Sequence, residues 1–119
     1  MRKHTKDDLI EILNRRKGKS GNFGVPILNG KKNYKGMMID YVMHQQSNNP
    51  KKYFVLELIK FPWGEKPELR IGYYILGRQR SVVGKWRWGQ SAPCIPLKDI
   101  DAIFKKAKKL VKGYNNFLV

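Results

Sequence analysis

Alternating apolar and polar residues through the middle of this chain predict β-strands. A period of two runs through residues 37–44, and a nearly continuous apolar run at residues 53–61 is typical of a central strand covered on both faces. Two more strands are predicted at residues 69–77 and 82–88, where the alternation returns after turn-forming residues. Together these segments predict a twisted antiparallel sheet of about four strands.

Helical patterns flank the predicted sheet. Thr5 followed by Asp8 is typical of a capping box, and it predicts a short N-terminal helix that ends near Gly18. A second helix is predicted after Pro96, because apolar residues recur there at helical spacing. The order of elements predicts one α+β domain over all 119 residues, with the C-terminal amphipathic helix packed on one face of the sheet.

Residues 18–36 connect the first helix to the sheet. Glycines recur through this segment and lysines accompany them. We therefore predict a long, mobile, basic loop here. At the other end, residues 114–119 are a short apolar tail that could add an edge strand, or pair between the two subunits of a homodimer.

The three tryptophans have different predicted environments. Trp86 and Trp88 share one face of a predicted strand, and two tryptophans so placed are more typical of a core than of a binding surface. Ile103 and Phe104 of the C-terminal helix are expected to cover them. Trp63 lies in a turn, so it is the better candidate for an exposed ring on which a nucleic-acid base stacks.

Positive charge dominates the composition. The chain has 25 Lys and Arg against 9 Asp and Glu, a net charge of +16. Residues 1–60 carry 13 basic and 5 acidic side chains and residues 61–119 carry 12 and 4, so each half has a charge of +8. Like charges at this density repel one another within the folded chain, and a polyanionic partner would relieve that repulsion. Nucleic acid is the commonest such partner.

Other classes fit the sequence less well. The apolar runs are much shorter than the ~20 residues of a membrane-spanning helix, and the basic N-terminus lacks the apolar region of a secretory signal. We expect a cytoplasmic protein that does not bind membranes. Cys94, His4 and His44 make a poor set of zinc ligands, so no metal and no cofactor are expected.

Cationic and aromatic residues are predicted on one face of the strand at residues 69–77 and on the strand after it. Such a mixture neutralises phosphates and stacks bases, as sequence-tolerant binding of single strands requires. We therefore predict a non-enzymatic protein that binds single-stranded DNA or RNA, with the loop at residues 18–36 closing over the strand. The residues assigned to this interface are Arg70, Tyr74, Arg78, Arg80, Lys85, Arg87, Trp63, Lys19, Lys31 and Lys32.

An enzymatic alternative rests on a few acidic residues and a lysine. Glu11 on the leading helix, Asp40 on one strand, and Glu57 with Lys60 on the next resemble the PD-(D/E)xK nuclease family. The resemblance implies a Mg²⁺-dependent nuclease in which Asp40 and Glu57 hold the metal and Lys60 orients the attacking water. Glu57 and Lys60 are three residues apart, so only a bulge would bring them to one face of a strand. If Glu57 is buried, we expect it to pair with a neighbouring Arg or Lys instead.

A third interpretation keeps the positive charge but changes the partner. A surface that attracts phosphates also attracts carboxylates. The chain could therefore be a small basic adaptor or inhibitor that binds an acidic protein surface.

Overall fold

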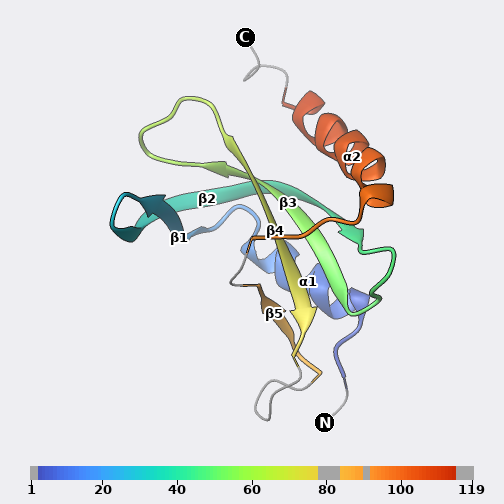
Figure 1. Ribbon diagram of the computed structural model, residues 1–119. Helices are drawn as coiled ribbons and strands as arrows, with labels where there is room; N and C mark the ends of the chain where they lie inside the picture. The colour runs from blue at the N-terminus through green and yellow to red at the C-terminus, as the bar shows by residue number, and fades with distance from the viewer. Residues whose placement is uncertain (1–2, 78–83, 90–91, 115–119) are drawn as a thin grey trace.

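Five antiparallel strands form one sheet whose spatial order follows the chain, β1-β2-β3-β4-β5, and two helices pack against it (Figure 1). The computed structural model describes residues 3–77, 84–89 and 92–114. These form a single α+β domain, so the predicted fold class is confirmed, with five strands in place of about four. In chain order the elements are α1 (Lys6–Arg16), β1 (Ser20–Ile27), β2 (Gly30–Gln45), β3 (Lys52–Lys60), β4 (Glu68–Leu76), β5 (Trp86–Trp88), the 3-10 turn η2 (Leu97–Asp99) and α2 (Ile100–Lys112).

The predicted N-terminal helix is α1, and it begins with the predicted capping box. The hydroxyl of Thr5 accepts a hydrogen bond from the backbone N–H of Asp8 at 3.4 Å, and the carboxylate of Asp8 accepts one from the backbone N–H of Thr5 at 2.6 Å. Leu9 and Leu13 lie one turn apart on the same side of the helix and are fully buried. This apolar side holds α1 against the sheet.

Residues 18–36 are not a mobile loop, because most of them form the hairpin of β1 and β2. The two strands pair along the whole length of β1. Gly30 begins β2 with a φ of 133°, a backbone conformation that favours glycine. At Gly36 an added Cβ would lie 3.1 Å from side-chain atoms of Phe23 and of Phe61, so this glycine admits close packing of rings. Gly30 therefore serves the turn and Gly36 the packing of rings. The mobile loop was predicted from the glycine content, and that prediction is wrong here.

β3 is the central strand that its apolar run predicts. Residues 53–59 are all buried, and alternate side chains point to opposite faces of the sheet. One set clusters with the buried leucines of α1, and the other clusters with Ile103 and Leu110 of α2. The two helices therefore cover opposite faces of the sheet at β3.

Trp86 and Trp88 lie on the α1 face of the sheet, so the predicted cover by Ile103 and Phe104 is wrong. The indole N–H of Trp86 donates a hydrogen bond to the backbone carbonyl of Thr5 at 2.7 Å, which ties β5 to the start of α1. Phe104 is 57% exposed. The physical reason is distance along the sheet, because α2 packs over β2 and β3 and β5 lies two strands further on.

The predicted C-terminal helix is α2, which Gly113 caps. The predicted edge strand at residues 114–119 lies outside the described residues except for Tyr114, and so does the homodimer contact that it would supply. None of the helices in the described part of the chain is long and apolar enough to cross a membrane.

The sheet curls so that strands far apart in its order approach one another. β1 and β4 are separated by two strands, yet the guanidinium carbon of Arg70 on β4 lies 4.7 Å from the ring centre of Phe23 on β1. β5 pairs only with the last three residues of β4, and β1 pairs only with residues 30–37 of β2. The curl and the short edge strands leave a hollow near β4 and an open stretch of strand on β2.

Candidate functional site

A buried carboxylate on β3 organises two arginines. Glu57 has no solvent exposure, and its cross-strand partner on β4 is Arg70. Arg70 donates hydrogen bonds from Nε at 2.9 Å and from NH2 at 2.6 Å to Oε1 of Glu57. NH1 of Arg16, at the end of α1, lies 3.1 Å from Oε2 of the same carboxylate. Two arginines around one carboxylate balance the buried charge and leave a net positive charge. Arg16 does so as an ion pair, because no described residue donates a hydrogen bond to Oε2.

Tyr74 completes this network from β4. Its hydroxyl accepts a hydrogen bond from NH1 of Arg16 at 2.8 Å, and only 7% of the residue is exposed. Burial raises the pKa of the Tyr74 phenol, so it stays protonated and neutral. The prediction that Tyr74 offers an exposed ring to a base is therefore wrong, because its ring belongs to the core beneath α1.

Arg70 lies between two aromatic rings. Its guanidinium carbon is 4.7 Å from the ring centre of Phe23 and 4.4 Å from that of Trp88. Trp88 reaches this position because Gly72 leaves room for it. An added Cβ at Gly72 would lie 2.0 Å from an indole carbon of Trp88. Arg70 is thus fixed by hydrogen bonds on one side and by rings on the other.

These side chains form one wall of a cavity of about 600 Å³, which we call the arginine cavity. Cations reach it from three elements, Arg16 of α1, Arg70 of β4 and Lys31 of the β1–β2 hairpin, and no described residue that lines it is Asp or Glu. Trp88 supplies an aromatic surface, and Asn22 and Asn33 supply amide donors and acceptors. The volume is that of a small-molecule site, and the chemistry suits an anion attached to a planar ring.

The structure gathers part of the predicted interface at this cavity. Arg70, Tyr74 and Lys31 line it, although Tyr74 does so as a buried residue. Lys19 lies beside it, in a hollow of about 230 Å³ that shares Arg16 and Asn22 with the cavity.

Three more predicted residues stand apart or cannot be placed. Lys32 is exposed on the hairpin, with Nζ 5.2 Å from the ring centre of Tyr34. Arg78 and Arg80 lie outside the described residues.

The prediction that Lys85 and Arg87 share a face of the sheet with Tyr74 is wrong. Tyr74 is paired with Trp88, whereas Arg87 is paired with Ile75. Because cross-strand partners lie on one face of a sheet and neighbours alternate, Arg87 projects from the face opposite to Tyr74. Lys85 is half-buried and precedes β5, where its carbonyl accepts a hydrogen bond from Gly77 at 2.8 Å.

Trp63 is exposed, as its position in a turn predicts. Its ring is parallel to that of Phe61, with 4.4 Å between ring centres, and Tyr34 meets it edge-on at 4.7 Å. Of the residue, 53% remains exposed, beside a hollow of about 490 Å³ that Lys35 and Lys60 also line. The turn therefore carries an aromatic platform with lysines around it.

A row of ring contacts connects the arginine cavity to Trp63. From Trp88 the contacts pass through Arg70 to Phe23, and Phe23 meets Phe61 edge-on with 6.0 Å between ring centres. Phe61 then stacks on Trp63. The cavity and the exposed platform are thus two ends of one row of contacts, in which the Arg70 guanidinium joins the ring of Trp88 to that of Phe23.

The nuclease-like arrangement is absent from the described residues. Asp40 is paired with Leu58, so it projects from the face opposite to Glu57, and Lys60 also lies on the face opposite to Glu57. The Glu57 carboxylate is buried and engaged by arginines, as expected for its non-catalytic role. Glu11 is exposed on α1. No group of three His, Cys, Asp or Glu residues in the described part of the chain could hold a metal ion.

Comparison with known proteins finds no family model, no curated protein and no solved structure that matches this chain.

Three residues of the site were not predicted from the sequence. Arg16 stood at the end of a short helix, Phe23 lay in the segment expected to be a loop, and Trp88 was assigned to a core under α2. The alternation around Phe23 and the Asn29-Gly30 pair were the available signals for a hairpin.

Proposed function

We propose that this protein binds single-stranded nucleic acid, DNA or RNA, without catalysing a reaction on it. The observation that carries the proposal is the arginine cavity, which Arg16, Lys31, Arg70 and Trp88 line together with no described acidic residue on the wall. Phosphate groups bind to the cations, and a base occupies the space beside the indole. The net charge of +16 supports the same class of partner.

The proposal favours a single strand over a duplex. A base inside a duplex is stacked and paired, so its faces are not available to a cavity or to an exposed ring. An unpaired base can enter the arginine cavity, and a neighbouring one can stack on Trp63. Stacking on an aromatic side chain contributes about 1–3 kcal/mol per base and depends little on sequence.

The cations have different roles in this proposal. Arg16 and Arg70 are held by the buried carboxylate of Glu57, so they lose little further freedom when an anion binds. Lys31 on the wall of the cavity and Lys19 in the neighbouring hollow are exposed and adaptable, and they bind phosphates where the nucleic-acid strand enters the cavity. The lysines are therefore the better residues to change, because the arginines also support the fold.

The test is a fluorescence-anisotropy titration with labelled oligonucleotides of one sequence, single- and double-stranded, as DNA and as RNA, at two salt concentrations. The variant Lys19→Gln with Lys31→Gln is compared with Lys105→Gln with Lys108→Gln, which removes the same charge from the exposed side of α2. We expect the first variant to weaken single-strand binding by about tenfold and the second by much less. Equal losses in both variants, or tighter binding of the duplex, would contradict the proposal.

A further inference from the structure

A second cationic surface lies on the other side of α1, where β2 has a free edge. Past Met37, no described strand pairs with β2 on its outer side. A groove of about 680 Å³ runs along this edge between α1 and α2. Four lysines line it, Lys6 and Lys17 from the α1 side and Lys106 and Lys109 from α2. One acidic residue, Asp40, also lines it and pairs with Lys17 at 3.2 Å, so the lining keeps an excess of positive charge.

Side chains occupy the outward-pointing backbone groups of this edge. The carboxylate of Asp40 accepts a hydrogen bond from the backbone N–H of Tyr41 at 2.8 Å. Nζ of Lys106 donates to the backbone carbonyl of Met43 at 2.9 Å. Native edges are often protected by charged side chains in this way, because an open edge can pair with another strand. The edge thus has the hydrogen-bonding groups that an added strand would use.

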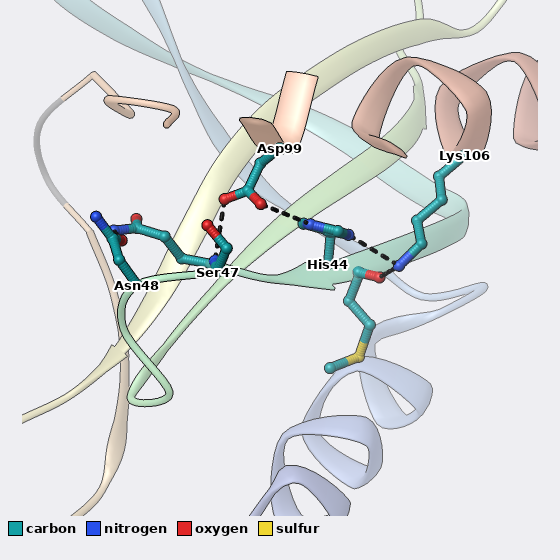
Figure 2. A network of polar contacts seen from close by, with 7 residues as sticks. His44, Ser47, Asn48, Asp99 and Lys106 are labelled. Atoms are coloured by element: carbon teal, nitrogen blue, oxygen red, sulfur yellow. Dashed lines mark hydrogen bonds and ion pairs between the residues drawn. The ribbon is translucent and has the colours of Figure 1, made fainter. Parts of the chain in front are cut away.

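Figure 2 shows how Lys106 is held beside His44. Nζ of Lys106 is 3.2 Å from Nδ1 of His44, and Nε2 of the same imidazole is 3.5 Å from Oδ1 of Asp99. Burial, and then the positive charge of Lys6, lower the pKa of the Lys106 ammonium. Lys6 and Lys106 therefore repel each other across the groove, and a carboxylate placed between them would relieve that repulsion.

We infer that the α1–α2 groove binds an acidic, extended segment of a partner protein, which adds as a strand to the edge of β2. The apolar side chains of Ile10 and Leu110 line the groove and suit the apolar residues of such a segment. Its acidic side chains would pair with the lysines, and its backbone would take the place of Lys106 at Met43. A peptide is favoured over a nucleic acid here because the N–H and C=O groups of a peptide backbone can replace these side chains as partners along the strand. The inference is independent of the function proposed for the arginine cavity.

The probe is a fluorescein-labelled peptide of eight residues in which glutamate and valine alternate. Its counterpart has the same charge, with prolines at alternate positions that prevent strand pairing. Lys6→Glu with Lys109→Glu changes two exposed lysines of the groove, and Lys105→Glu with Lys108→Glu is the matched control on the outer side of α2. We expect the groove variant to weaken binding of the alternating peptide at least about tenfold, the control variant to do so only slightly, and the proline peptide to bind at least about tenfold more weakly.

Hydrogen exchange gives a second readout. Binding of the alternating peptide should slow exchange of the backbone N–H of Met43, which lies on the same side of the strand as its carbonyl. Equal losses in the two variants, equal binding of the two peptides, or unchanged exchange at Met43 would overturn the inference. Displacement of the peptide by a single-stranded oligonucleotide in the Lys19→Gln with Lys31→Gln background would also overturn it, because the groove would then be a nucleic-acid surface.

Discussion

Glu57 and Arg70 face each other across β3 and β4, and both hydrogen bonds from Arg70 end on one oxygen of a carboxylate that has no solvent exposure. The pair joins two neighbouring strands and, through Arg16, also joins them to α1. It places two guanidinium groups at the wall of the arginine cavity. The same contact therefore supports the fold and fixes the position of two cations at the candidate site.

Arg70→Ala is expected to destabilise the protein as well as weaken binding. It leaves a buried carboxylate with Arg16 as its remaining partner among the described residues, and loss of one member of a buried ion pair typically costs about 3 kcal/mol of the free energy of unfolding. Urea denaturation measures this. Lys31→Ala, at an exposed position of the same cavity, is the control and should unfold at nearly the same urea concentration as the wild type. Equal midpoints for wild type and Arg70→Ala would show that the pair contributes little to stability.

Gly72→Ala tests the position of Trp88. The new methyl group would lie 2.0 Å from an indole carbon, so the ring must move away from Arg70. Overpacking of this kind costs about 1–3 kcal/mol, and we also expect weaker oligonucleotide binding and a shifted tryptophan emission. Gly21→Ala is a suitable control, because an added Cβ there would meet only Phe23, at 3.9 Å. An unchanged emission spectrum in Gly72→Ala would contradict the packing described here.

Trp63→Ala separates stacking from charge. The change leaves every cation in place, but it removes the ring that stacks on Phe61 and the indole N–H that donates to Glu68 at 3.1 Å. Because the residue is half-exposed, we expect the free energy of unfolding to fall by only about 1 kcal/mol. Single-strand binding should weaken by about 1–3 kcal/mol, the usual contribution of one stacked base. The ratio of affinities between wild type and variant should be similar at low and high salt, because a stacking contact releases no counterions. A loss confined to low salt would indicate that Trp63 acts only by positioning nearby lysines.

Local patterns predicted most of the elements of this fold. Two patterns that depend only on residues close together in the sequence are confirmed. They are the capping box at Thr5 and Asp8 and the apolar run of β3. The hairpin of β1 and β2 was missed because glycine was interpreted as flexibility. At Gly30 and Gly36 it serves a turn and a close ring contact instead.

The site depends on relationships that no local pattern contains. Both faces of β4 carry apolar residues, so the alternation alone did not show that Tyr74 is buried while Leu69 is 41% exposed. The face of Arg87 depends on the register between β4 and β5, which the connection between these strands sets. Phe23 reaches Arg70 because the sheet curls, and Arg16 reaches Glu57 because α1 packs on the same face of the sheet. Net charge is the basis on which a polyanionic partner is proposed, whereas the shape of the cavity comes from long-range packing.

Asp99 predicts a specific dependence of stability on pH. Hydrogen bonds from Ser47, foremost that from its backbone N–H at 3.0 Å, hold the pKa of the Asp99 carboxyl below its ordinary value of 3.8 in the folded protein (Figure 2). Because the folded state binds this proton less readily than the unfolded chain, Asp99 contributes its full stabilisation at pH values above about 5 and loses it as the pH falls through the folded pKa. Asp99→Asn should therefore be clearly less stable than the wild type near neutral pH, and the difference should shrink as the pH is lowered from about 5 towards 2. Urea denaturation over this range checks the prediction, with the exposed Asp101→Asn as the control, which should cost less at neutral pH. Parallel curves for wild type and Asp99→Asn at every pH would show that the carboxylate does not hold the turn after β2 against α2.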